Sequence, residues 1–457
     1  MPDSSSSAPC SPRFRVALLA VLALSFVVRG GALLATRDAF RLDTDGYRQL
    51  ASNLVRHGTF SNDVPSPRPL RDGQGERVPT AYRPPLYPLL LAGCMATGLP
   101  EHLMVGLLHL GLGLGTVALA WRLGRSWTGD RRVAALAALL VTCDPILLRW
   151  STQLMTETLA TFLTTAGLWA LTWAGRADGR AVGMRAALAG VVLGLAALCR
   201  PSLLLWAVAA GVALAAANRR RLTAIGAAEG PCHRHLFAVG YGLAPFALGA
   251  AIVISPWAIR NQWQFGRPVV TTTHGGYTLL LANNPEFYEW LRSAPWGSVW
   301  RADRFNAAWD ARKPADELQA DRLAYAEAWQ TIRAEPGTFV RACFVRLGRF
   351  WSPLPHQVAE NESSVGRLSR WTVAAWYGVE LTLAILFLAR LACRAWAPTP
   401  STWLWGGLLV ASLMAAHVLY WTDMRMRAPA MPVIALAAAS VVFWRRPLAT
   451  QAVQQSV

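Results

Sequence analysis

Two carboxylates separated by one residue stand at the start of a long polar segment in this 457-residue chain. They are Asp43 and Asp45, in the stretch Asp-Thr-Asp-Gly-Tyr that ends at Tyr47. The first apolar stretch ends just before them, and the polar segment runs on to Arg83 and Tyr87 in Tyr-Arg-Pro-Pro-Leu-Tyr-Pro. A positioned carboxylate can take a proton from a hydroxyl or an amine. Acidic residues held beside an apolar segment therefore predict a catalytic site at a membrane surface.

More polar side chains lie near the ends of apolar segments farther along the chain. Glu157 opens one such segment and His417 lies within another. Ionisable groups at membrane depth are costly, so each needs a partner or a function. Arginine at the level of the lipid headgroups can hold a phosphate through two parallel hydrogen bonds. The candidates for such contacts are Arg200, Arg260, the adjacent Asn261, Arg425 and Arg427.

As a set, these residues indicate one kind of chemistry. A carboxylate base and a phosphate clamp at one face of a membrane suit the transfer of a sugar from a lipid phosphate. The phosphate is the leaving group, and the arginines stabilise the charge that develops on it. For any single residue of the set, an interfacial anchor or a structural salt bridge is the alternative.

The composition predicts an all-α polytopic membrane protein. Hydrophobic residues make up 54% of the chain and charged residues only 15%. Several apolar stretches approach the length of about 20 residues that crosses a bilayer as a helix. The net charge of +18 is nearly all arginine and falls mainly beside apolar segments, so membrane topology explains it better than nucleic-acid binding. The seven cysteines form no CxxC pair, which argues against a disulfide framework and against a zinc site.

The arginine distribution also predicts the topology. The apolar segment 85–98 is too short to cross, because about fourteen residues give only about 21 Å of helix. If it does not cross, the arginine-rich loops and both termini all fall on the cytoplasmic side. The first span retains Arg29 near its outer end, where it can reach the interface; a cleavable signal peptide is the alternative for this segment. The candidate spans are 14–36, 102–121, 133–149, 155–174, 182–199, 201–217, 236–256, 372–389, 403–420 and 429–444.

These spans divide the chain into regions. We expect residues 14–256 to form a transmembrane catalytic module whose first external loop is 37–83. Residues 257–371 form an external loop or small subdomain, with helical patterning in 317–334. The C-terminal transmembrane helices occupy 372–446. Cytoplasmic tails, the first of them disordered, take residues 1–13 and 447–457.

With these motifs in view, the chain resembles bacterial members of the membrane-embedded GT-C glycosyltransferases. It looks most like the dolichyl-phosphate-mannose–protein mannosyltransferase-like family, which includes the aminoarabinose lipid A transferases and the RgtA/B/C/D-like transferases. Five stretches carry the resemblance, in family order: 43–51 with 58–60, Arg83-Pro-Pro-Leu-Tyr-Pro, Leu-Met-Thr-Glu157, Pro-Trp-Ala-Ile-Arg260-Asn261, and Arg425-Met-Arg427-Ala-Pro-Ala-Met-Pro.

The resemblance implies a GT-C-like bundle of about 10–12 spans with outer-face loops and interfacial helices. In the family, an aspartate of the first external loop is the essential acid/base residue, and it matches Asp43. Asp45 is then the second acid of a DxD-like pair, and Glu157 matches the second external acid. Such a pair is more typical of a catalytic acid with a helix-capping neighbour than of a metal clamp. No cofactor is implied with certainty, although a divalent metal is an option.

The implied function is sugar transfer, with inversion, from a polyprenyl-phosphate-linked donor to a glycan, lipid or protein acceptor of the cell envelope. The place is the outer face of a bacterial inner membrane. The sequence leaves the sugar and the acceptor open. A non-enzymatic transporter or lipid-carrier flippase is the main alternative, and a membrane assembly factor is another. A flippase would place charges deep along several helices, whereas here the polar groups gather at one face.

Overall fold

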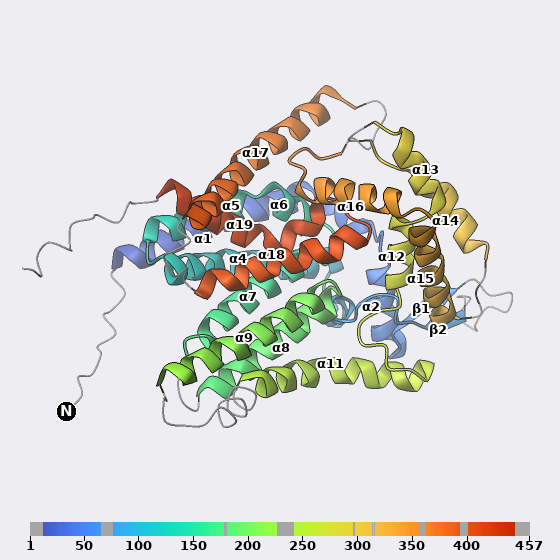
Figure 1. Ribbon diagram of the computed structural model, residues 1–457, viewed down its shortest axis with the longest axis horizontal. Coiled ribbons are helices and arrows are strands. Elements are labelled where there is room, and N and C mark those ends of the chain that lie inside the picture. Colours follow the sequence, from blue (N-terminus) through green and yellow to red (C-terminus); the bar gives the residue numbers. More distant parts are fainter. Residues whose placement is uncertain are drawn as a thin grey trace, which may run out of the picture.

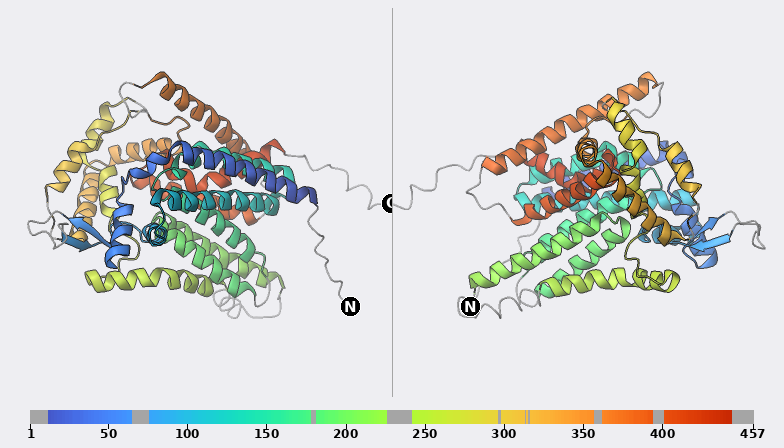
Figure 2. Two further views of the ribbon diagram at one scale, coloured as in Figure 1. Left: turned by 180° about the vertical axis from the view of Figure 1, so that it is seen from behind. Right: turned by 45° about the vertical axis from the view of Figure 1, so that its right-hand side comes forward.

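The computed structural model describes residues 12–64, 76–177, 181–225, 242–295, 298–312, 314, 316–356, 362–393 and 401–443. Most of the two predicted tails lies outside these residues. The described chain is a helical bundle with a smaller helical region at one end (Figure 1). The first described helix begins, and the last one ends, at the end of the bundle away from this smaller region (Figure 2).

Long apolar helices build the bundle. Their apolar side chains suit a lipid environment, and their backbone N–H and C=O groups are hydrogen-bonded within each helix. A short 3-10 segment, η3 (Met424–Ala430), precedes the last of these helices. The helices are α1 (Pro12–Ala35), α4 (Glu101–Thr128), α5 (Arg131–Cys143), α6 (Pro145–Ser151), α7 (Glu157–Ala174), α8 (Ala181–Cys199), α9 (Leu203–Ile225), α11 (Ala244–Phe265), α17 (Ser364–Cys393), α18 (Ser401–Leu419) and α19 (Met431–Val442).

Shorter and more polar elements cover one end of this bundle. The strands β1 (Ser61–Val64) and β2 (Glu76–Pro79) pair antiparallel, with Ser61 opposite Pro79. The helical elements are η1 (Arg37–Arg41), α2 (Tyr47–His57), α3 (Leu86–Met95), α12 (Gly275–Ala282), α13 (Pro285–Ser293), α14 (Asp303–Asp310), α15 (Glu317–Ala334) and α16 (Pro336–Trp351).

The chain is a multi-pass membrane protein, as predicted, but fewer helices meet the criteria for a span than expected. By length and composition, six described helices could cross a membrane, or seven if α5 and α6, bent by 48°, form one span. The expectation was about 10–12. One reason lies in α7, which is rich in threonine and is buried by other helices along most of its length. A helix enclosed by protein does not need a continuously apolar surface. The short helix α3 has ten residues and is about 15 Å long.

Arg29 corrects one expectation about the first helix. Its side chain is only 2% exposed, and its Nη2 donates a hydrogen bond to the carbonyl of Val141 at 2.8 Å. It therefore points into the bundle and does not reach out to the interface.

The helices α12–α16 have an apolar core of their own. Leu280, Phe287, Tyr288 and Trp300 lie at its centre. The predicted region 257–371 covers these helices, but its two ends fall inside α11 and α17 and not in linkers. The carboxylate of Glu317, at the start of α15, accepts hydrogen bonds from the Thr80 hydroxyl, the Ala81 amide and the Thr273 hydroxyl. This contact joins α12–α16 to the segment after β2.

Candidate functional site

Asp43 lies at the start of α2, and its two carboxylate oxygens have different surroundings. Oδ2 accepts hydrogen bonds from the backbone amides of Arg48 at 3.0 Å and Gln49 at 3.3 Å. These amides belong to the first turn of the helix, where backbone N–H groups lack helical partners. Oδ1 is buried and has no hydrogen-bond partner in the described structure. Asp43 thus caps the helix with one oxygen and leaves the other free. The predicted capping neighbour, Asp45, does not cap.

Asp45 instead forms an ion pair with Arg83. The two atoms, Oδ1 of Asp45 and Nη2 of Arg83, are 2.9 Å apart, and Arg83 Nε also donates to the Asp45 carbonyl. The guanidinium lies over the rings of Tyr47 and Tyr82, at 5.7 and 5.3 Å from their centroids. The pair therefore fastens the segment before α2 to the segment before α3.

Glu157 begins α7 and is 2% exposed. Its Oε1 faces two arginines: Arg200 Nη1 at 3.5 Å and Arg425 Nη1 at 3.7 Å. The Oε2 atom of Glu157 and the Nη1 of Arg200 are buried without a hydrogen bond, whereas the Nε of Arg425 lies 3.3 Å from the Oδ2 of Asp423. The geometry holds two guanidinium groups close together while part of their donor capacity stays unused.

The acidic loop and the arginine pair meet around Tyr47. This ring is 4% exposed and packs edge-on against Tyr87, with centroids 5.2 Å apart. Burial raises the pKa of Tyr47, and its charged neighbours are Arg83, Asp45, Glu157 and Arg200. Segments more than 150 residues apart in sequence thus supply one charged cluster. We call Asp43, Asp45, Tyr47, Arg83, Glu157, Arg200 and Arg425 the polar cluster.

Buried hydrogen bonds link the Tyr87 hydroxyl to His109 and, through it, to the backbone of Ser151. Its hydroxyl lies 3.0 Å from Nε2 of His109, and Nδ1 of His109 lies 2.8 Å from the carbonyl of Ser151. Tyr87 and His109 are fully buried. Tyr87 therefore supports Tyr47. His109 has a clear structural role that its sequence setting, within an apolar helix, did not reveal.

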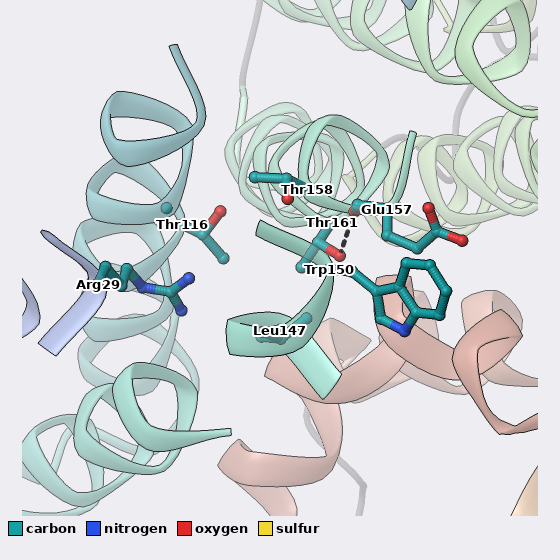
Figure 3. A pocket seen from close by; sticks show the side chains of 8 residues that line it. Arg29, Thr116, Leu147, Trp150, Glu157, Thr158 and Thr161 are labelled. Atoms are coloured by element: carbon teal, nitrogen blue, oxygen red, sulfur yellow. Dashed lines mark hydrogen bonds between the residues drawn. The ribbon is translucent and has the colours of Figure 1, made fainter. Parts of the chain in front are cut away.

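A narrow crevice lies behind Glu157, between α1, α4, α6 and α7 (Figure 3). Its volume of about 10 Å³ suits roughly one water molecule. Arg29 lies at one side of it, and the Glu157 carboxylate points away from Arg29 (Figure 3). A sugar cannot enter this crevice, so a substrate must approach Glu157 from the side of the polar cluster.

Two predicted binding residues engage the protein backbone. Arg260 donates to the carbonyls of Thr80 and Phe60, both at 2.8 Å, and to the side chain of Asn261. Asn261 is fully buried and donates to the carbonyl of Val269. The structure places both residues beneath the β1–β2 hairpin, and their donors already have partners.

Arg427 lies in a second buried group of polar side chains. It is fully buried, and its Nη1 donates to the carbonyls of Phe350 at 2.9 Å and Ser352 at 2.8 Å. Its guanidinium is 4.5 Å from the ring centroid of Tyr377, whose hydroxyl donates to Asp144 at 3.0 Å. The predicted phosphate contact of Arg427 stays untested. Its observed contacts tie η3 to α16 and α17.

His417 lies between Phe350 of α16 and the two arginines of the polar cluster. It is 8% exposed, its ring stacks on Phe350 with centroids 5.8 Å apart, and Arg200 and Arg425 are its charged neighbours. It therefore borders the polar cluster from α18.

The polar cluster does not fit a metal held by the DxD-like pair. Asp43 uses one oxygen as a helix cap and Asp45 is paired with Arg83. Within the described residues, no group of three or more His, Cys, Asp or Glu side chains is arranged to hold a metal ion. A hard cation such as Mg²⁺ or Ca²⁺ needs several free oxygen ligands. We therefore derive no step through a metal.

Tyr82 and His274 were not singled out from the sequence, although Tyr82 belongs to the Tyr-Arg-Pro-Pro motif. Their rings make an edge contact with centroids 4.2 Å apart, next to Arg83. Burial, together with the nearby charge of Arg83, lowers the pKa of His274 to about 3. The sequence offers no signal for this contact, because the two aromatic residues are 192 positions apart in the chain.

Comparisons with known proteins confirm the expected resemblance. Residues 82–258 match the family model described as dolichyl-phosphate-mannose-protein mannosyltransferase. This segment includes Arg83, Tyr87, Glu157 and Arg200 of the candidate site. No curated protein matches the chain.

Among solved structures, the chain is similar to the oligosaccharyltransferase AglB of Archaeoglobus fulgidus. The complex with a tethered acceptor peptide gives a TM-score of 0.53 at 12% identity, covering 94% of this chain and 49% of that one. The apo form gives 0.52 at 14% identity, covering 93% and 50%. The complex with an inhibitory peptide and a dolichol-phosphate gives 0.50 at 12% identity, covering 93% and 50%. The chain thus spans about half the length of these enzymes. At these identities the likeness shows the fold, which is the expected GT-C-like membrane fold.

Proposed function

We propose that this protein is a membrane glycosyltransferase that moves a sugar from a polyprenyl-phosphate-linked donor to an acceptor of the cell envelope. The observation that carries the proposal is the meeting of the acidic loop with the Arg200–Arg425 pair on Glu157. Asp45 of this loop, Glu157 and Arg200 are charged neighbours of Tyr47, and Asp43, with one free buried oxygen, lies two positions before Asp45. Asp43 can accept a proton, and the arginines can hold a phosphate.

Asp43 acts as the general base. Its Oδ2 is fixed by two backbone amides at the start of α2, so the carboxylate cannot turn away. Its Oδ1 takes the proton from the acceptor hydroxyl as the acceptor oxygen bonds to the anomeric carbon of the sugar. The bond from that carbon to the phosphate oxygen breaks, and the electron pair leaves with the lipid phosphate. A single displacement of this kind inverts the anomeric configuration.

Arg200 and Arg425 hold the leaving phosphate. The Oε1 atom of Glu157 faces both guanidinium groups and keeps them side by side. Its distances to their Nη1 atoms are too long for ideal hydrogen bonds. The Nη1 atoms of both arginines make only these long contacts and are available for phosphate oxygens, and arginine suits such oxygens because its planar fork can give two parallel bonds. Charge-assisted bonds of this type strengthen as the leaving group gains charge. Glu157, predicted as a catalytic acid, acts here by positioning these arginines.

Two independent findings support a lipid-linked donor. The matching family model is described by a dolichyl-phosphate sugar, and one structure with the same fold is a complex with a dolichol-phosphate. A phosphate at the end of the bundle would place the lipid tail along the apolar helices. Tyr47, Arg83, Tyr87 and His417 complete the proposed donor environment; for Arg260, Asn261 and Arg427 the observed backbone contacts favour a structural role.

The site faces outward in this proposal. The described junction between α4 and α5, which holds Arg131 and is predicted to be cytoplasmic, lies at the end of the bundle opposite to α2 and α12 (Figure 1). The enzyme then acts at the outer face of a bacterial inner membrane. Helices α12–α16 lie beside the polar cluster and supply the contacts to a glycan, lipid or protein acceptor.

Mass spectrometry of cell-envelope glycans in a deletion strain tests this function. We expect one sugar residue to be missing from one class of envelope glycan, and to return when the wild-type gene is restored. An unchanged set of envelope glycans, lipids and glycoproteins would contradict the proposal and favour a transporter or an assembly role.

A further inference from the structure

A row of aromatic side chains leads from the polar cluster into the helices α12–α16. Tyr82 lies under Arg83 and touches His274, and His274 stacks on Tyr277 with centroids 5.4 Å apart. Tyr277 in turn lies 6.2 Å from Trp309 on α14. All four rings are partly exposed. Tyr277 and Trp309 pack against the core around Phe287 and Trp300 with part of their surface and leave the rest exposed.

The row ends at an open groove between α13, α14 and α15. The groove has a volume of about 500 Å³, and Trp309 and Phe305 form part of its wall. Polar groups occupy the rest, among them Glu286 and Gln330, whose side chains are exposed and have no partner within the described residues. Among the charged residues that line the groove, Glu327 pairs with Arg312 and Glu335 pairs with Arg292, so Glu286 is the carboxylate left without an ion pair within the described residues.

We propose that this row and groove form a binding track for an acceptor that is itself an oligosaccharide or polysaccharide. The proposal rests on the glycosyl-transfer function argued above. Sugar rings present apolar C–H faces and a rim of hydroxyls. Partly exposed aromatic rings suit the faces, and free carboxylates and amides suit the hydroxyls. Ring contacts that repeat along a line suit a chain of repeating sugar units.

The charge of the track narrows the class of acceptor. The arginine that lines the groove is already paired with Glu327 whereas Glu286 has no ion pair, so the groove disfavours strongly anionic chains. His274 adds no positive charge at neutral pH, because burial lowers its pKa to about 3. The expected acceptor is therefore a neutral or amino-substituted glycan, with its growing end at Asp43 and its earlier units along Tyr82, Tyr277 and Trp309.

Binding measurements on the full chain in lipid nanodiscs test the track without requiring turnover. The probes are chitohexaose and mannohexaose, their disaccharides, and a lysine-rich hexapeptide. All variants are made in an Asp43→Asn background, so that no probe is consumed. We expect a hexasaccharide to bind more tightly than its disaccharide. Trp309→Ala and Tyr277→Ala should each weaken that binding by about tenfold or more, as for other buried aromatic anchors.

Trp329→Ala is the matched control, because Trp329 lies on α15, is 49% exposed and does not line the groove. It should bind as the parent does. Glu286→Gln, on the exposed rim, gives a second variant that keeps the fold, and should weaken binding less than Trp309→Ala. The track is overturned if no oligosaccharide binds, if binding is indifferent to Trp309 and Tyr277, or if only the hexapeptide binds. A missing envelope sugar in the deletion strain together with any of these results would reject the track and leave the transferase function standing.

Discussion

At the scale of single residues, the site depends on how the protein partners its buried charges. Arg425 and Arg427 are two positions apart, yet one faces Glu157 and the other donates to backbone carbonyls of α16 and the turn after it. Both residues belong to the 3-10 segment η3, where neighbouring side chains point in different directions. In the proposed function Arg425 binds the donor phosphate, and Arg427 fixes η3 against α16.

This difference gives a paired prediction. Arg425→Lys keeps the charge but loses the fork, and should weaken apparent donor affinity by at least about tenfold, since a charge-assisted hydrogen bond is worth about 1.5–3 kcal/mol. Its thermal unfolding temperature should stay close to that of the wild type. Arg427→Lys should instead lower the unfolding temperature, because an ammonium loses the planar packing of the guanidinium over the Tyr377 ring and is more strongly hydrated. Donor titrations and thermal melts of the two variants check this. The opposite pattern would make Arg427 the phosphate ligand.

The sequence identified the residue types of the site but not their partners. Asp43, Asp45 and Glu157 stood out because carboxylates are rare beside apolar segments, and the structure brings the last two to the same cluster around Tyr47. Arg260 looked equivalent to Arg425. It differs because the carbonyls of Phe60 and Thr80, 200 and 180 positions away, meet it in the fold. Only tertiary packing decides between such arginines.

At the scale of elements, a few buried contacts fix where the acidic loop lies. Helix α2 is held by Asp43 at its start, the following hairpin by Arg260, and the segment 80–82 by Glu317. Helix periodicity and the arginine pattern predicted the bundle and the short helix α3. They could not show that α7 is enclosed by other helices, because its threonine-rich sequence resembles a weak span.

Glu317 provides a test of this arrangement. Its carboxylate accepts from three donors, so Glu317→Gln presents an amide N–H₂ where an acceptor is needed. Leaving buried donors unsatisfied costs about 1–3 kcal/mol. We expect faster hydrogen exchange in residues 76–83 and 271–276, with the bundle helices unchanged. Glu289→Gln, on the exposed side of α13, is the control. Exchange in 76–83 that matches the wild type would mean that Glu317 does not hold this segment.

At the scale of the whole molecule, the proposed function requires that the polar cluster and α12–α16 lie outside. The segments predicted to be external do meet at one end of the bundle: Thr273 bonds to Ala81, and Arg200 and Arg425 face Glu157. Among the described arginines, Arg131 and Arg132 at the start of α5 lie at the other end, where positive charge favours the cytoplasm.

Cysteine labelling tests the orientation. In a background without the seven native cysteines, Ser298→Cys and Ser293→Cys should react with an impermeant thiol reagent in intact spheroplasts. Arg132→Cys, at the start of α5 in the opposite end of the bundle, should react only after lysis. Position Ser66, in the first external loop, is a further site for this experiment, although it lies outside the described residues. Labelling in the reverse order would invert the topology.

The proposed function depends on Asp43 as the base of the glycosyl transfer, and the turnover of one variant decides whether Asp43 has this role. The measurement is release of polyprenyl phosphate from a polyprenyl-phosphate sugar, by wild type and Asp43→Asn, with the natural acceptor identified from the deletion strain. Asparagine keeps an oxygen that can cap α2 but cannot take a proton. We predict turnover reduced by about 10²–10⁴, as for other lost acid–base groups, with donor affinity and unfolding temperature retained. Turnover within a factor of two of wild type would contradict the account.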